Sequence, residues 1–226
     1  MNPAAGSEPT PDARQHAPAT LRNRDFILPI LQRLLPAQGL VLEIAAGSGE
    51  HACYFAAQLP GCRWQPTDMD EAALASIEAW RSAAALPNLL PARALDVAAA
   101  DWPVALADAL VCINMIHYSP WDSTPALFAG AARVLAPGGV VYCYGPYMRD
   151  GRHTAPSNES FDDWLKARDP RFGVRDLAAA VISSASSMHS ASAAPSPQCS
   201  ISSANSKGAA AEITKPGASS RPTSEP

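Results

Sequence analysis

Two glycines that directly follow a short apolar run mark the first place in the chain where ligand chemistry is expected. The run is Leu40-Val41-Leu42-Glu43-Ile44, and Ala45-Ala46-Gly47-Ser48-Gly49 follows it. Glycine lets a backbone turn sharply and come close to a ligand. In an open α/β sheet, ligands bind outside the carboxyl ends of the strands, where such a loop lies. The pattern therefore predicts a ligand site at this loop.

Carboxylates recur at the expected ends of the first three strands. Asp68 follows Glu43 by 25 residues, about the spacing of a carboxylate that binds ribose hydroxyls. Met69 is placed to cover an adenine face, and Asp96 to accept the adenine amino group. Each acid also has a plainer interpretation: Glu43 as a capping or ion-pairing residue, Asp68 as a helix cap and Asp96 as a turn residue. Their recurrence at three successive strand ends favours a shared ligand.

Two cofactors compete for this loop. Gly47-Ser48-Gly49-Glu50-His51-Ala52 matches the G-x-G-x-x-A pattern of dinucleotide binding. That pattern places its first glycine directly after an apolar strand, whereas Glu43 interrupts the strand end here. A pyrophosphate also gains from a positive helix start, and Glu50 puts negative charge there. S-adenosylmethionine has no phosphate, and its ammonium and sulfonium groups suit an acidic wall. The loop therefore favours S-adenosylmethionine over NAD.

Methyl transfer from a sulfonium needs little help from acids and bases. It is an in-line displacement of a good leaving group, so the protein mainly positions the two reactants. A base helps only where the acceptor must first lose a proton. The candidates near the fourth and fifth strand ends are Asn114, His117, Tyr118, Tyr144 and Tyr147. Asn114 can orient an amine and His117 can act as a base, although a buried histidine in a turn explains His117 equally well.

Apolar runs that alternate with helical patterns predict a Rossmann-like α/β fold, a doubly wound parallel sheet with helices on both faces. The expected strands cover residues 40–44, 63–67, 90–97, 109–114 and 140–144. Helices are expected over residues 26–35, from the glycine loop through Leu59, from a cap at Asp68 or Asp70, and from Thr124-Pro125 to Pro137. A later short helix carries Phe161, Trp164 and Leu165, which either cover the acceptor site or simply pack.

The chain divides into three regions. Residues 1–20 have the composition of a disordered leader, and residues 21–180 supply the Rossmann-like domain. Residues 181–226 contain 14 Ser and 9 Ala but no Leu, Phe, Tyr or Trp, too little apolar surface to offset the entropy of ordering. We therefore expect a disordered tail without the usual C-terminal antiparallel strands. Residues 140–144 would then form an open sheet edge, which favours self-association or a partner.

Composition narrows the classes of function. Hydrophobic residues make up 47% of the chain, and the net charge of −4 argues against a nucleic-acid partner held through phosphates, without excluding RNA. No stretch approaches the roughly 18 apolar residues of a membrane span, and the N-terminus does not read as a signal peptide. The five cysteines are scattered without zinc-ligand spacing, which predicts reduced thiols in the cytoplasm and no bound metal.

These residues resemble a known family. The pattern Glu43-x-Ala45-x-Gly47-x-Gly49 with Asp68, Asp96 and Leu135-x-Pro137-Gly138-Gly139 resembles the motif set of class I methyltransferases. Over about residues 21 to 178 the chain more closely resembles the methyltransferase-like protein 26 family. The motifs are Arg22-Asn23, Trp64-Gln65-Pro66-Thr67-Asp68, Asn114-Met115-Ile116-His117, Tyr144-Gly145-Pro146-Tyr147, Ser157-Asn158-x-x-Phe161-Asp162 and Gly173-x-Arg175-Asp176.

The resemblance implies the fold and S-adenosylmethionine as cofactor, but it supplies no methyl acceptor. Asp68 would hold the ribose, Asp96 the adenine, and Asn114 would face the transferable methyl. Together with the analysis above, the expected cofactor contacts are Glu43, Ala45, Gly47, Gly49, Asp68, Met69, Asp96, Val97 and Asn114. The expected catalytic candidates are Asn114, His117 and Tyr147.

Three hypotheses of function follow. The first is a methyltransferase that acts on an unknown small molecule or protein. The second is an NAD-dependent oxidoreductase. The third is a non-catalytic domain that binds the cofactor or nothing, which the absence of C-terminal strands would explain. Binding of S-adenosylmethionine or NAD separates the first two.

Overall fold

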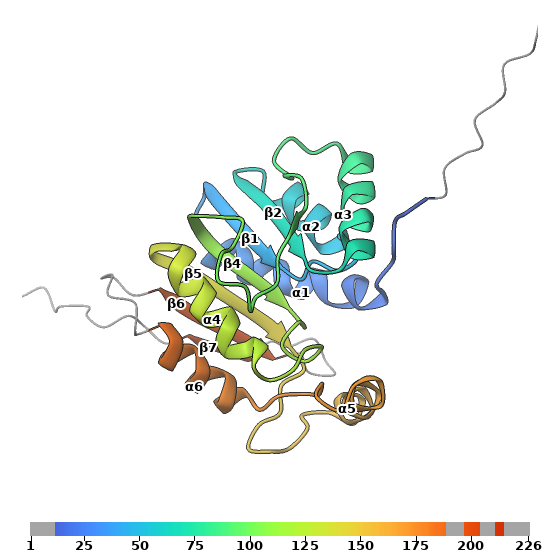
Figure 1. The fold of residues 1–226 in the computed structure, drawn as a ribbon, viewed down its shortest axis with the longest axis vertical. Coiled ribbons are helices and arrows are strands. Elements are labelled where there is room, and N and C mark those ends of the chain that lie inside the picture. Colours follow the sequence, from blue (N-terminus) through green and yellow to red (C-terminus); the bar gives the residue numbers. More distant parts are fainter. Residues whose placement is uncertain (1–11, 189–196, 204–210, 215–226) are drawn as a thin grey trace, which may run out of the picture.

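A single mixed sheet forms the centre of the computed structural model, which describes residues 12–188, 197–203 and 211–214 (Figure 1). The strand order is β3-β2-β1-β4-β5-β6-β7. The strands are β1 Gly39–Ile44, β2 Cys62–Asp68, β3 Arg93–Ala94, β4 Ala107–Ile113, β5 Leu135–Gly145, β6 Gln198–Ser203 and β7 Ala211–Thr214. Strands β1 to β6 pair in parallel, and β7 pairs antiparallel with β6. The predicted Rossmann-like α/β class is confirmed.

Helices cover both faces of this sheet (Figure 1). They are α1 Pro18–Leu34, α2 Glu50–Gln58, α3 Glu71–Ala84, α4 Ser123–Val134, α5 Pro156–Arg168 and α6 Leu177–Met188. Alternate side chains of a strand point to opposite faces, so Val41 packs with α1 and α2 while Leu42 packs with α4. Burial on both faces accounts for the unbroken apolar run of β4. None of the described helices is both long and apolar enough to cross a membrane.

Two boundaries in the first half differ from the predicted ones. The third strand is only Arg93–Ala94 rather than residues 90–97. Pro91 has no N–H to donate to a ladder, and Leu89 forms only an isolated bridge to Trp64. Helix α1 begins at Pro18 rather than Phe26, because polar contacts rather than an apolar stripe hold its first turns. The predicted leader boundary at residue 20 is therefore wrong for residues 12–20, and residues 1–11 lie outside the described residues.

The prediction that the Ser/Ala-rich tail adds no strand is wrong. Helix α6 continues to Met188, β6 pairs along β5 from Val140↔Gln198 to Gly145↔Ser203, and β7 follows β6. Small side chains fit here because β6 lies in the sheet: Ser200 and Ser202 are buried, and Ile201 joins the core that α4 and α6 cover. Strand β5 is consequently no edge, which removes the basis for predicted self-association. Predictions for residues 189–196, 204–210 and 215–226 lie outside the described residues.

Candidate functional site

The loop between β1 and α2 turns through left-handed backbone conformations. The φ angles are +52° at Ala45, +58° at Gly47 and +89° at Gly49, a region that favours glycine. A Cβ added to Gly49 would lie 2.8 Å from the Cα of Ile77, so Gly49 permits the close approach of α3. A Cβ added to Gly47 would meet no atom within 4 Å. Gly47 therefore faces open space, as a residue under a ligand must.

The backbone N–H groups of this loop already donate within the protein. The bonds run from Ala46 to the Thr67 carbonyl (2.8 Å), from Gly47 to Asp68 Oδ2 (2.9 Å), from Gly49 to the Ala46 carbonyl (3.1 Å) and from Glu50 to Ser48 Oγ (3.3 Å). A phosphate bound at a helix start needs such N–H groups free. The largely buried Glu50 carboxylate also stands at the start of α2. The loop is thus poorly suited to a pyrophosphate.

Asp68 ends β2 directly beside the glycine loop. Its Oδ2 accepts the Gly47 N–H, and its Oδ1 accepts the Asp70 N–H at 3.0 Å. The helix cap that the plainer interpretation assigned to Asp68 or Asp70 is made by Asp70, whose side chain accepts the Ala73 N–H. Each carboxylate oxygen can accept a further hydrogen bond. Asp68 is therefore held in place by main-chain donors and keeps acceptor capacity for hydroxyl groups.

Glu43 lies beneath the loop, where it is only 1% exposed. Its Oε2 accepts the indole N–H of Trp64 at 2.6 Å. Burial, opposed by this hydrogen bond and reinforced by the nearby Asp68 carboxylate, raises the pKa of Glu43 to about 8. The structure therefore brings Glu43 to the predicted strand end, but as a supporting residue in the core rather than an open acidic wall.

The third strand end contributes residues of differing exposure. Ala94 of β3 pairs with Asp68 of β2. Asp96 therefore lies near Asp68, at the carboxyl ends of these two strands. The Met69 side chain is 70% exposed, and Asp96 is exposed with Oδ1 accepting the Ala98 N–H at 2.9 Å. Val97 is buried in the core. Asp96 therefore makes the bond of a turn residue, and together with Met69 it leaves polar and apolar surface open at this edge.

Asn114 occupies the end of β4 in a left-handed conformation, with φ +65°. Its N–H donates to the Tyr144 carbonyl at 2.8 Å, which ties the ends of β4 and β5 together. No hydrogen-bond partner for its half-buried side-chain amide lies in the described part of the chain. This amide is the polar group that the fold leaves unused at the fourth strand end.

The two other catalytic candidates are core residues. His117 is fully buried, its Nδ1 accepts the Arg175 N–H at 3.2 Å, and its ring lies against Gly145 and Tyr147. Burial lowers the pKa of His117 to about 3 and raises the pKa of Tyr147 well above its usual range. Of the two interpretations of His117, the geometry favours the packed histidine, because neither ring can meet an acceptor in this arrangement.

A clamp on the loop after β4 was missed in the sequence. The Arg175 guanidinium donates to the carbonyl groups of Ile116, Ser119 and Arg171 at 2.7–3.3 Å. Asp162 accepts a hydrogen bond from the Val174 N–H at 2.7 Å and forms an ion pair with Lys166. Both residues stand in motifs quoted for the family resemblance, but a motif alone does not indicate that its arginine and aspartate bind backbone rather than ligand.

An aromatic cluster lies beside this clamped loop. Phe161 and Trp164 of α5 stack at 5.8 Å, and Tyr118 contacts both rings at 5.6 and 5.8 Å. Leu165 is fully buried and anchors α5, whereas Trp164 remains 43% exposed. Helix α5 therefore packs through Leu165 and also presents partly open aromatic surface next to the end of β4.

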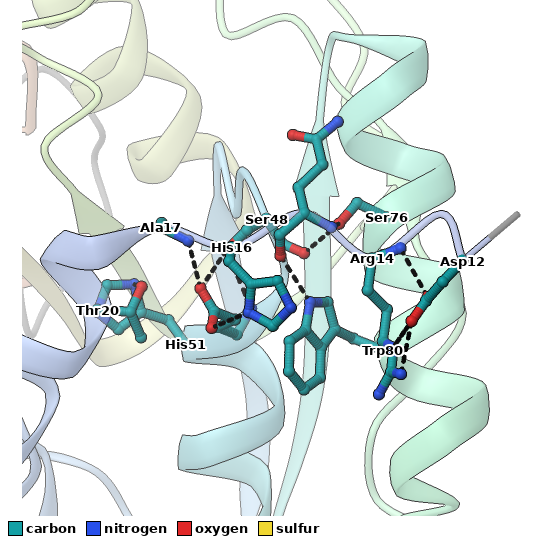
Figure 2. A network of polar contacts seen from close by, with 11 residues as sticks. Asp12, Arg14, His16, Ala17, Thr20, Ser48, His51, Ser76 and Trp80 are labelled. Atoms are coloured by element: carbon teal, nitrogen blue, oxygen red, sulfur yellow. Dashed lines mark hydrogen bonds and ion pairs between the residues drawn. The ribbon is translucent and has the colours of Figure 1, made fainter.

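A segment of the expected leader reaches the helices beside the glycine loop. Residues 12–17, called the strap below, run along α3 to the N-terminal end of α2 (Figure 2). Gln15 donates its N–H to Ser76 of α3, and Ala17 donates its N–H to Glu50 of α2. The sequence contains no apolar or motif signal for these contacts, because they use mainly backbone groups of the strap.

The fold is that of class I methyltransferases. The chain matches the S-adenosylmethionine-dependent methyltransferase SibL (TM-score 0.62, 18% identity, 75% of this chain and 49% of that one). It also matches a putative sarcosine dimethylglycine methyltransferase from Galdieria sulphuraria (TM-score 0.62, 17% identity, 80% of this chain and 63% of that one). A third match is a putative methyltransferase from Haloferax volcanii in complex with the Trm112 methyltransferase activator. Its TM-score is 0.57 at 18% identity, over 75% of this chain and 70% of that one. The chain thus spans about half to about two thirds of these proteins.

The family itself is defined by a sequence match. Residues 14–197 match the family described as protein of unknown function (DUF938), and the chain belongs to this family. The matched range begins within the strap and ends just before β6, so it covers the glycine loop, the clamp and α6.

Proposed function

We propose that this chain is an S-adenosylmethionine-dependent methyltransferase. The observation that carries the proposal is the glycine loop, where Gly47 faces open space beside Asp68 while the neighbouring N–H groups are bonded internally. Such a loop suits a nucleoside cofactor without phosphate better than a dinucleotide. The motif resemblance to the methyltransferase-like protein 26 family adds support for the same activity.

The residues at the carboxyl ends of the strands fit this cofactor. Asp68 would accept hydrogen bonds from the ribose hydroxyls, Met69 and Asp96 would contact the adenine, and Gly47 would lie under the ligand. When bound, S-adenosylmethionine supplies a methyl group on a sulfonium, a reactive carbon with a good leaving group. The chain's own contribution is then to orient the acceptor and exclude water.

Asn114 is the residue we assign to the acceptor side. Its amide can accept a hydrogen bond from an amine or donate one to an oxygen, which orients a lone pair for in-line attack. His117 is a neutral imidazole and Tyr147 a protonated phenol inside the core, because burial lowers the pKa of the first and raises the pKa of the second, and the His117 ring instead packs against Gly145. We therefore propose a mechanism based on positioning, with an acceptor, small molecule or protein, that reacts without a strong base from the chain.

The competing hypotheses lose their main supports. The NAD-dependent oxidoreductase requires a pyrophosphate cradle that the bonded N–H groups and Glu50 disfavour. The hypothesis of a non-catalytic domain rested on absent C-terminal elements, whereas β6 and β7 complete the sheet.

Cys53, Cys62, Cys112 and Cys143 form no disulfide, which favours the cytoplasm as the compartment of this activity.

Calorimetric titration of the whole chain with S-adenosylmethionine and, separately, with NAD tests the proposal. We expect saturable binding of S-adenosylmethionine and of its demethylated product, and no heat of binding with NAD. Binding of NAD without S-adenosylmethionine would restore the oxidoreductase hypothesis. Binding of neither compound would leave a domain without the proposed cofactor.

A further inference from the structure

The strap is joined, through one serine of α3, to the same loop that the proposed cofactor would contact. The Ser76 hydroxyl accepts the Gln15 N–H at 2.8 Å and donates to the Ser48 carbonyl at 2.7 Å (Figure 2). Ser48 lies between Gly47, which faces open space, and Gly49. One buried hydroxyl thus joins the strap backbone to the glycine loop, and hydrogen bonds in such a chain strengthen one another.

Further contacts hold both sides of the strap. Trp80 of α3 donates its indole N–H to the Gln15 carbonyl at 2.9 Å. On the other side, the Glu50 carboxylate accepts the Ala17 N–H at 2.5 Å and meets His16 Nδ1 at 3.1 Å. Glu50 is the residue after Gly49, so its side chain links the strap to the loop a second time. The strap is therefore held from α2 and α3 at once.

The chain just beyond the strap has its own anchor. His51 Nε2 meets Asn23 Oδ1 of α1 at 2.7 Å, and α1 packs against the sheet through Ile27 and Leu31. Undocking of residues 12–17 thus need not unfold α1. The strap contacts are few and mainly polar, as expected of a segment that opens locally at low cost.

We infer that the strap is a latch for the cofactor site: it docks against α3 and Glu50 beside the glycine loop, and its docking and S-adenosylmethionine binding favour each other. This inference rests on the proposed function. A ligand on Gly47 stabilises the loop conformation in which Ser48 holds the Ser76 hydroxyl toward the strap and Glu50 accepts the Ala17 N–H. Because linkage is reciprocal, the docked strap must then raise cofactor affinity by the factor by which the cofactor favours docking. Ser76 and Trp80 act as positioning residues in this latch.

Hydrogen–deuterium exchange of the full chain, followed by mass spectrometry, tests the latch. The Gln15 and Ala17 N–H groups are hydrogen-bonded only while the strap is docked. We expect a peptide that covers residues 12–18 to exchange about tenfold more slowly with saturating S-adenosylmethionine than without it. If titration shows binding but this peptide exchanges at an unchanged rate, the latch is wrong and the proposed function stands. If nothing binds, the proposed function fails and the latch fails with it.

Two variants and a matched control separate the latch from general stability. Ser76→Ala removes the central hydroxyl, and Trp80→Phe removes the indole N–H that donates to Gln15 while it keeps an aromatic ring. Ser82→Ala makes the same serine change at an exposed position of α3. We expect both latch variants to weaken S-adenosylmethionine binding about fivefold or more and to speed exchange of residues 12–18, and the control to do neither. Wild-type affinity in Trp80→Phe, the milder variant, together with faster strap exchange would overturn the coupling.

Discussion

At the scale of single residues, Gly47 and Gly49 differ in what a side chain would meet. Gly49 is closed by Ile77, whereas Gly47 is open. We predict that Gly47→Val abolishes S-adenosylmethionine binding and leaves the helix content nearly unchanged, at a strain cost of about 1–2 kcal/mol for positive φ. Titration and circular dichroism measure the two effects. Gly49→Ala should lower the melting temperature more than Gly47→Val does, because its Cβ would clash with the backbone of Ile77. Wild-type binding by Gly47→Val would show that no ligand rests on this loop.

Asp68 offers a second test, with its neighbour Asp70 as the control. We predict that Asp68→Ala weakens S-adenosylmethionine binding by about 1–3 kcal/mol, because ribose hydroxyls lose a charged acceptor. Asp70→Ala removes the cap of α3, which costs about 1 kcal/mol of stability, and should leave the binding affinity unchanged. Both affinities are read by titration. Equal affinity of Asp68→Ala and wild type, with an intact fold, would remove Asp68 from the site.

At the scale of elements, β6 shows how a strand can hide in a sequence of small residues. We predict that Ile201→Ala lowers the free energy of unfolding by about 2–5 kcal/mol, the cost of truncating a fully buried isoleucine. Ile182→Ala is the matched control, because Ile182 on α6 is 65% exposed and should change stability by less than about 0.5 kcal/mol. Urea denaturation compares the two. Equal small effects would mean that β6 contributes nothing to the fold.

The elements that could be predicted are those with strong apolar patterns. Strands β1, β4 and β5 are each built around a short apolar run, and the glycine loop follows β1 at the expected place. Strand β6 could not be predicted, because its burial depends on pairing with β5 rather than on its own hydrophobicity. The strap was missed for a related reason: backbone N–H and carbonyl groups anchor it, and these are the same in every sequence.

The candidate site was predictable in its position and only partly in its roles. Spacing placed Glu43, Asp68 and Asn114 at three strand ends, and the structure has them there. Spacing does not reveal burial, so it could not decide between a catalytic role and a place in the core for His117 and Tyr147. Burial of a turn residue depends on what packs over it, here Arg175 from a segment far along the chain.

At the scale of the whole molecule, the buried Glu43 makes stability depend on pH. Its pKa is raised from 4.5 to about 8, so between these values the folded state retains a proton that the unfolded state has lost. Stability from this group therefore falls as the pH rises from about 5 to 8, by up to about 1.4 kcal/mol per pH unit. We predict that Glu43→Gln, which cannot ionise, gains stability relative to wild type over this range. Melting temperatures at pH 5, 6.5 and 8 measure the difference, and a pH-independent difference would contradict the prediction.

The position of β6 in the sheet has a consequence for synthesis of the chain. Strand β5 leaves the ribosome well before its partner β6, with α5 and α6 still to come. At about 5–20 residues per second, the nascent sheet keeps an unpaired β5 for several seconds. During that time the backbone of β5 is a template for pairing with other chains. The intermediate most prone to aggregation is thus one in which β1 to β5, with the ligand-binding ends of β1, β2 and β4, are already assembled while β6 is still missing.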